Sequence, residues 1–186
     1  TPLNFGSPYG CSKGSSDQYV LDYAKTFQLN TTVLRLSCIY GPNQWGTEDQ
    51  GWISWFIIKA YESSKINIFG NGKQVRDILF INDLVLLIKK CIKKKNLKGE
   101  VYNIGGGRKN SISLLNLIDI LSDVHKKKIK YTLRKKRIGD QKYFVNDLTK
   151  VKKNLSWEPK VSSKTGIKLF QDWILKNIVK TTNFKI

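Results

Sequence analysis

Helix-type and strand-type patterns alternate along this chain of 186 residues, and that alternation restricts the fold more than any other feature. Apolar residues recur at helical spacing over 8–28, 51–63, 83–94, 113–123, 147–155 and 163–178. The segments between them are short and rich in β-branched and aromatic residues, at 31–36, 66–69, 77–81, 100–104 and 129–133. This alternation predicts an α/β fold and argues against the even strand ladder of an all-β domain.

Capping residues predict where several helices begin. Ser7 is a suitable N-cap, and Pro8 suits the first helical position after it. Asn82 or Asp83 is expected to cap a later helix, and Ser111 or Ser113 another. The glycines at 105–107 follow a strand but lack the G-x-G-x-x-G spacing and a suitably placed acidic residue, so they predict a tight turn.

The charge of the chain first suggests a polyanion partner. It carries 33 Lys and Arg against 14 Asp and Glu, a formal net charge of +19. Only five of these cations are arginine, the residue suited to bidentate reading of phosphates and bases, and the lysines concentrate over 89–98 and 126–136. We therefore favour a solvated lysine-rich surface that does not bind nucleic acid. A polyanion-binding scaffold is the alternative.

Cysteine and histidine usage narrows the chemistry and the compartment. Cys11, Cys38 and Cys91 are odd in number and lack C-x-x-C spacing, which indicates free thiols in a reducing cytoplasm. His125 is the only histidine, so neither a histidine metal site nor a Ser-His-Asp triad is expected. No apolar run reaches the roughly 18 residues of a membrane span. Methionine is absent and the chain opens at Thr1, so we interpret it as a carboxy-terminal fragment.

Tyr9 and Lys13 form the first candidate for catalysis. They lie four residues apart on the first predicted helix and so share one of its faces. A phenol has a pKa near 10 in water, and a neighbouring ammonium group lowers the pKa of a phenol by favouring its ionised form. A tyrosine tuned in this way can take a proton from a sugar hydroxyl.

Six sequence blocks in a fixed order connect this pair to a known family. They are SPYGCSKG at 7–14, RLSCIYGP at 35–42, GNG at 70–72, VRDILFINDL at 75–84, YNIGG at 102–106 and RIGD at 137–140. From Ser7 to about Ile178 the chain resembles the extended short-chain dehydrogenases of the NAD-dependent epimerase/dehydratase family, which act on nucleotide-diphosphate sugars. The resemblance implies NAD as cofactor and a nucleotide-diphosphate sugar as substrate.

The resemblance also implies a domain organisation. Residues 1–45 would be the C-terminal part of an incomplete, doubly wound Rossmann-like sheet. Residues 46–178 would mainly form a small α/β substrate-binding lobe, with some elements returning to that sheet, and 179–186 a tail. The glycine-rich pyrophosphate turn, the acidic ribose ligand and a catalytic Ser or Thr would precede Thr1. The intact protein is expected to be a homodimer.

Site residues follow from the matched blocks. Tyr9 would be the catalytic base and Lys13 its tuner, both also touching the cofactor. The remaining cofactor contacts implied are Leu36, Ser37 and Ile39. The implied substrate contacts are Cys38, Gln50, Phe69, Arg76, Arg137 and Asp140, with the two arginines on the diphosphate, Phe69 beside the base and Asp140 on the ribose. Many relatives carry Asn at the place of Cys38, so its polar contact is the least supported of these.

One further block indicates a narrower branch of the family. DQGWISWF at 49–56 is not typical of the 4-epimerases or 4,6-dehydratases, and it favours an epimerase acting at carbon 2 of a CDP-sugar. The alternatives are a 4-epimerase, a 4,6-dehydratase or a decarboxylase of the same family. A non-catalytic fragment or a polyanion-binding scaffold is the alternative outside the family's chemistry.

Overall fold

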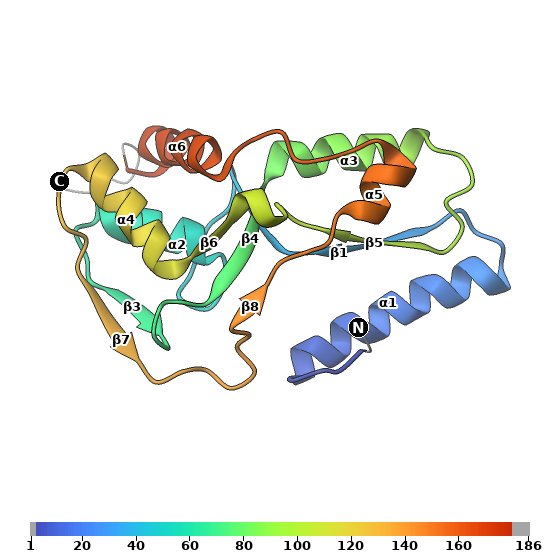
Figure 1. The fold of residues 1–186 in the computed structure, drawn as a ribbon, viewed down its shortest axis with the longest axis horizontal. Coiled ribbons are helices and arrows are strands. Elements are labelled where there is room, and N and C mark those ends of the chain that lie inside the picture. The colour runs from blue at the N-terminus through green and yellow to red at the C-terminus, as the bar shows by residue number, and fades with distance from the viewer. Residues whose placement is uncertain (1–2, 180–186) are drawn as a thin grey trace.

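The computed structural model describes residues 3–179, which form an α/β arrangement (Figure 1). The α-helices are α1 Pro8–Thr26, α2 Trp52–Tyr61, α3 Ile81–Lys93, α4 Leu114–His125, α5 Thr149–Leu155 and α6 Ser163–Ile174. Short helical turns follow at Arg108–Asn110 and Leu175–Val179. The strands are β1 Thr32–Leu36, β2 Cys38–Tyr40, β3 Ile66–Phe69, β4 Val75–Phe80, β5 Glu100–Ile104, β6 Ser111–Ser113, β7 Tyr131–Arg134 and β8 Tyr143–Phe144. Beyond Val179, the expected tail lies outside the described residues.

Parallel pairing dominates the strands. β1 pairs with β5, β2 with β4, and β3 with β7, all in parallel, while β8 lies parallel beside β4. The pair β4–β6 is antiparallel. Parallel strands need helical crossovers between them, and the helices of this chain supply those crossovers. The expected α/β fold is therefore confirmed.

Two hydrophobic clusters hold most of these elements together. The larger cluster joins α2, α4 and α6 to β2, β3 and β4, with Ile57, Ile68, Leu117 and Phe170 among its fully buried members. The smaller cluster joins α3 and α5 to β4 and β5. Figure 1 shows α1 lying along the β1–β5 pair, apart from the other helices. The cluster of α2, α4 and α6 with these strands is called the lobe below.

Two of the predicted helix caps are confirmed, and a third is wrong. The Ser7 side chain accepts a hydrogen bond from Gly10 N at the start of α1, and Ser113 caps α4 in a reciprocal pair with Asn116. The predicted cap of α3 at Asn82 or Asp83 is wrong, because the helix begins directly after Phe80 without a side-chain cap. Asp83 is instead buried, and its carboxylate accepts the backbone N–H groups of the segment 160–161.

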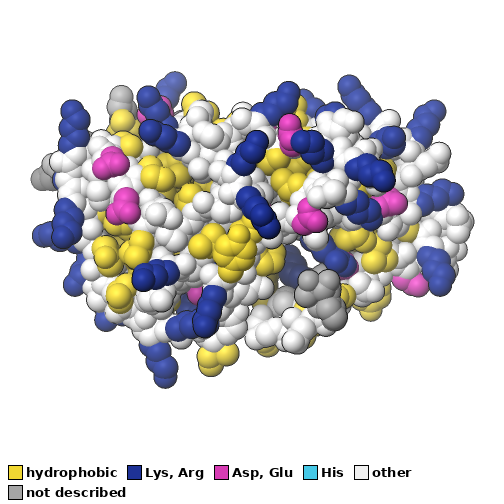
Figure 2. Space-filling model, in the orientation of Figure 1, with side chains coloured by type: hydrophobic (Ala, Val, Ile, Leu, Met, Phe, Trp, Pro, Cys, Tyr) yellow, Lys and Arg dark blue, Asp and Glu magenta, His cyan; other side chains and the backbone are white. Residues whose placement is uncertain are grey.

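Cationic side chains are spread over the surface that Figure 2 shows. Lys and Arg lie over the lobe and over the β1–β5 region alike, without gathering into one stripe on this face. A scattered distribution of this kind suits a solvated surface better than a continuous phosphate-binding track. Within the described part of the chain, no helix is both long enough and apolar enough to cross a membrane.

Candidate functional site

Tyr9 and Lys13 lie on one face of the first turns of α1, as their spacing predicts. The Tyr9 side chain is 65% exposed, and Lys13 Nζ lies 5.5 Å from the centroid of its ring. An ammonium group at this distance is attracted to the face of an aromatic ring. The hydroxyl is thus not buried in a core, and the pair is accessible to a ligand.

Contacts with the segment 31–35 and with the segment before the helix hold α1 in place. The Thr31 hydroxyl donates a 3.3 Å hydrogen bond to the Val20 carbonyl. Asp17, one turn beyond Lys13, forms a two-pronged ion pair with Arg35 on β1, with distances of 2.9 Å and 2.6 Å. The hydrogen bond from the Arg35 guanidinium holds the pKa of Asp17 below its usual value. Gly14 lies against the Phe5 ring so closely that a Cβ there would come within 2.0 Å of it. These contacts set where the start of α1 lies.

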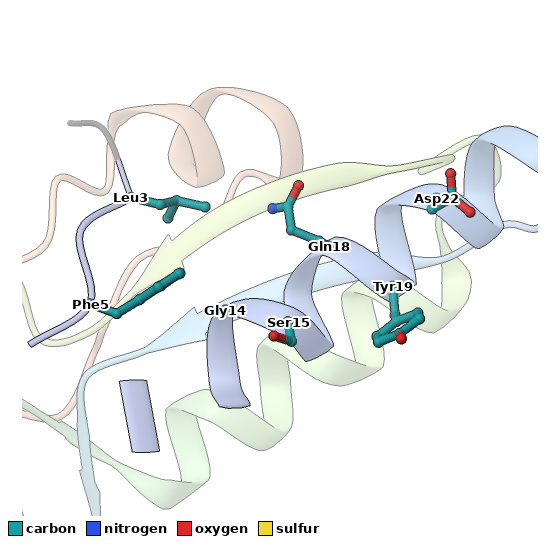
Figure 3. Close-up of a pocket in the computed structure, with 7 residues that line it drawn as sticks. All are labelled: Leu3, Phe5, Gly14, Ser15, Gln18, Tyr19 and Asp22. Atoms are coloured by element: carbon teal, nitrogen blue, oxygen red, sulfur yellow. The ribbon is translucent and has the colours of Figure 1, made fainter. Parts of the chain in front are cut away.

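An open groove runs between α1 and the segment before it (Figure 3). Its volume is about 400 Å³, and its lining residues are Leu3, Phe5, Gly14, Ser15, Gln18, Tyr19 and Asp22. Neither Tyr9 nor Lys13 is among them, and no predicted substrate residue is. We therefore do not assign the groove to the reaction, because the groups that could perform it lie elsewhere.

The loop after β1 is organised by the buried carboxylate of Asp77. The Ser37 hydroxyl donates to Asp77 Oδ1, while the backbone N–H groups of Gly107 and Asn146 each lie 3.1 Å from Oδ2. Three separate segments thus meet on one fully buried side chain of β4. Because a buried carboxylate without these donors would be strongly destabilising, Asp77 fixes the position of all three segments.

The glycines at 105–107 serve this same junction. A Cβ on Gly105 would lie 2.0 Å from Asp77 Oδ2, and one on Gly106 would lie 2.1 Å from the Ile78 carbonyl oxygen. The turn is therefore packed closely against β4, and both glycines are needed for this packing. This agrees with the tight turn expected from the sequence.

The three remaining predicted cofactor contacts, which are Leu36, Ser37 and Ile39, lie close together in the chain at that junction. Leu36 is exposed at the end of β1, and Ser37 follows it with its hydroxyl occupied by Asp77. Ile39 packs against the smaller hydrophobic cluster. Of the three, Leu36 presents the most side-chain surface to an incoming group.

Cys38 lies among Trp52 and Arg76. Burial raises the pKa of the Cys38 thiol, and the nearby Trp52 indole and Arg76 guanidinium oppose that rise only in part. The side chain also packs against the larger hydrophobic cluster. Cys38 is therefore a neutral thiol at this position, beside Trp52 of the DQGWISWF block and Arg76 of the VRDILFINDL block.

Arg76 and Asp140 meet directly, although the sequence predicts separate roles for them. Arg76 Nη2 lies 2.6 Å from Asp140 Oδ1, and the Arg76 side chain is 13% exposed. Gln74 Nε2 bridges the other Asp140 oxygen, at 3.3 Å, to the Phe69 carbonyl at 2.6 Å. This network links the end of β3, the start of β4 and the segment 137–140.

Arg137 contacts a ring and a carboxylate at once. Its Cζ lies 4.0 Å from the centroid of the Phe69 ring, and its Nη2 lies 2.8 Å from Asp49 Oδ1 and 3.1 Å from the Glu48 carbonyl. Gln50, by contrast, is exposed and its described bonds join only its backbone to Thr47. Among the predicted substrate residues, Phe69, Arg76, Arg137 and Asp140 therefore form one connected group.

The segment 137–140 also approaches the start of α1. A Cβ on Gly139 would lie 3.1 Å from the Gly6 carbonyl oxygen, three residues before Tyr9. Gly139 has a φ of 76°, which a side chain would disfavour. The fold thus brings the arginine-bearing segment next to the helix that carries the phenol and the ammonium group.

Asp49 and Asp77 are contributors that the sequence analysis assigned no role. Asp77 carries a signal that could have been used, since it stands directly before the apolar run 78–81, and a carboxylate buried at such a position is normally paired. Asp49 carries no such signal, because its partner Arg137 is remote in the sequence. Among residues 3–179, no three His, Cys, Asp or Glu side chains lie together as metal ligands would.

The fold places the chain among the Rossmann-like α/β proteins. It is similar to the UDP-glucose 4-epimerase of Thermotoga maritima solved with UDP-glucose, with a TM-score of 0.84 and 33% identity, over 92% of this chain and 54% of that one. It is also similar to the UDP-glucuronic acid 4-epimerase of Bacillus cereus solved with UDP-glucuronic acid and NAD, with a TM-score of 0.85 and 30% identity, over 95% and 54%.

The sequence relationship is more specific. Residues 1–105 match the NAD dependent epimerase/dehydratase family, and the chain belongs to that family. It is 45% identical to the CDP-paratose 2-epimerase of Salmonella typhi, over 93% of this chain and 53% of that protein. It is 35% identical to the UDP-glucuronate 4-epimerase of Thermodesulfobacterium geofontis, over 100% and 55%. The chain spans about half the length of these curated relatives.

Proposed function

We propose that this chain is the proton-transfer and nucleotide-sugar-binding part of an NAD-dependent nucleotide-sugar epimerase, with CDP-paratose as its substrate. The observation that carries this proposal is the approach of the segment 137–140 to Gly6, three residues before Tyr9. The 45% identity to a CDP-paratose 2-epimerase supports the choice of sugar nucleotide, as does the DQGWISWF block.

The chain's own residues have defined roles in this proposal. Tyr9, as phenolate, removes the proton of the sugar 2-hydroxyl and later returns it, while Lys13 stabilises the ionised phenol. When bound, NAD supplies reversible hydride transfer at carbon 2. The keto-sugar that results is reduced on its other face, so the configuration inverts without net oxidation.

Substrate binding falls to the connected group around Phe69. Arg76 and Arg137 present guanidinium forks, which suit the paired oxygens of a diphosphate better than ammonium groups do. Asp140 accepts a hydrogen bond from a ribose hydroxyl, and Phe69 lies beside the base. Holding the nucleotide at these points places the sugar toward Tyr9.

Products distinguish this function from its relatives within the family. The intact protein with NAD should convert CDP-paratose to its 2-epimer and leave UDP-glucose unchanged, as read by NMR. Tyr9→Phe should reduce the rate by at least about a hundredfold while nucleotide binding persists, because only the proton transfer is lost. Conversion of UDP-glucose in preference to CDP-paratose would assign the chain to the 4-epimerases instead.

Only part of an NAD site lies in this chain. The exposed Tyr9–Lys13 pair fits the nicotinamide end, whereas Gly105 and Gly106 are used in internal packing against β4. We expect the rest of the site to lie upstream in the intact protein. Isothermal titration of the chain alone with NAD should therefore detect no tight binding, and submicromolar affinity would contradict this division.

A further inference from the structure

Arg137 and Phe69 contact each other in this structure, although the proposed function assigns them to different parts of the nucleotide. Arg137, the proposed diphosphate ligand, covers one face of Phe69 at 4.0 Å, which is where a base would stack. The same guanidinium lies 2.8 Å from the Asp49 carboxylate, which stands where a phosphate oxygen would bind it. The Arg137 side chain is 38% exposed and that of Asp49 is 89% exposed, so a ligand can reach both.

We propose that Asp49, Arg137 and Phe69 form a latch, which the diphosphate of a nucleoside diphosphate opens and a nucleoside without phosphate does not. This inference rests on the proposed function and deepens it. Phosphate oxygens compete with Asp49 for the guanidinium of Arg137. When the guanidinium moves to the phosphates, it uncovers the Phe69 ring for the base. Binding of the diphosphate and of the base are thereby linked, and Asp49 is a specificity-determining residue.

The surrounding structure holds Asp49 in place for this exchange. The turn that carries it is closed by backbone hydrogen bonds between Thr47 and Gln50, of 2.8 Å and 3.3 Å. Its neighbour Glu48 accepts a 2.7 Å hydrogen bond from Asn67 on β3, the strand that ends in Phe69. The carboxylate is therefore presented to Arg137 by a turn anchored to the same strand as the ring.

The energetics allow the latch to open. An ion pair between exposed side chains is weak, and a cation over a partly exposed ring such as that of Phe69 adds little more. A diphosphate offers several oxygens with charge, and charge-assisted bidentate bonds to arginine are stronger than either. A nucleoside offers no such replacement, so it must displace the guanidinium without compensation.

Isothermal titration with CDP and with cytidine tests this through responses of opposite sign. In the full chain, Arg137→Ala should weaken CDP binding by at least about tenfold and strengthen cytidine binding by about two- to fivefold. Asp49→Asn should strengthen binding of both ligands by about two- to fivefold. Asp123→Asn, the same charge change at an exposed position of α4, should leave both affinities within about twofold.

The possible outcomes distinguish failure of the latch from failure of the proposed function. If Arg137→Ala leaves cytidine binding unchanged or weaker, or if Asp49→Asn fails to tighten CDP binding, the latch is wrong even though the chain binds nucleotide. If the unaltered chain binds neither CDP nor UDP, the proposed function fails and the latch fails with it. Circular dichroism of each variant checks folding, and Arg137→Gln is the second variant should the alanine form not fold.

Discussion

α1 and α6 are held in the molecule by different means. α1 is 19 residues long and buries only Gly14 and Ala24. α6 is 12 residues long and buries Gly166, Ile167, Phe170, Gln171 and Ile174. No residue of α1 belongs to either hydrophobic cluster of the described chain, whereas α6 is central to the larger one.

The difference separates stability from chemistry. α6 is placed by apolar packing, and it carries none of the predicted site residues. α1 carries Tyr9 and Lys13. Its attachments include the Arg35–Asp17 pair, the hydrogen bond from Thr31 to the Val20 carbonyl, and the contact of Gly14 with Phe5. Its exposed aromatic side chains include Tyr19 and Tyr23, which leaves a face open to further contacts, including the homodimer contact that stays a prediction.

The largest effect on stability is expected from creating a cavity in the hydrophobic core of the lobe. Phe170 is fully buried against Tyr40 and Trp173, so Phe170→Ala should lower the free energy of unfolding by about 3–5 kcal/mol. Phe27→Ala, just after α1 at a residue that is 59% exposed, is the matched control and should cost less than about 0.5 kcal/mol. Urea denaturation measures both, and similar losses would remove the contrast between the two helices.

A smaller loss of stability is expected where three segments meet on the Asp77 side chain. Asp77→Ala leaves the N–H groups of Gly107 and Asn146 without their acceptor. The Ser37 hydroxyl loses the carboxylate but keeps the backbone carbonyl of residue 77. We expect a loss of about 2–3 kcal/mol in the same denaturation measurement. Asp123→Asn provides an exposed carboxylate for comparison, and an equal effect there would mean that Asp77 does not organise the junction.

The attachment of α1 should be weaker still. Asp17→Asn removes the charged partner of Arg35, which is itself partly exposed, so we expect a loss of about 1 kcal/mol or less. Native-state hydrogen exchange should show the amides of α1 exchanging up to about fivefold faster, with those of α6 unchanged. Faster exchange in α6 as well would show that the two helices are not independent.

Acid should act on α1 in the same way as that variant. The Arg35 hydrogen bond lowers the pKa of folded Asp17 below its ordinary value of 3.8. The pair therefore contributes its full stabilisation above pH 3.8, and loses it as the pH falls below that value through the folded pKa. Hydrogen exchange compared at pH 5 and pH 3 should show selective loosening of α1, and Asp17→Asn should abolish the selectivity.

The smallest effect is expected at the proposed base. The Tyr9 side chain is 65% exposed and its hydroxyl makes no hydrogen bond among the described residues, so Tyr9→Phe should change the free energy of unfolding by less than about 0.5 kcal/mol. A greater loss would mean that the hydroxyl has a structural role. Combined with lost activity in the intact protein, an unchanged stability would assign this hydroxyl to chemistry.

Elements of four or more residues were predictable, and shorter ones were not. The strands expected at 66–69 and 100–104 have those bounds as β3 and β5, and Ser7 caps α1 as its position predicts. The short strands β2, β6 and β8 went unpredicted, because two or three residues are too few to show a period. Asp83 resembles a helix cap by position, but the chain uses its carboxylate to anchor residues 160–161.

The sequence alone determined the α/β class, most helix positions and the pairing of Tyr9 with Lys13, because each depends on residues within a few positions of one another. Only the tertiary structure decided which distant side chains meet. Asp77 joins Ser37 and Asn146 across 40 and 69 positions. Arg137 meets Asp49 across 88. Periodicity reports the faces of single helices and strands, whereas contacts between segments depend on how those faces pack.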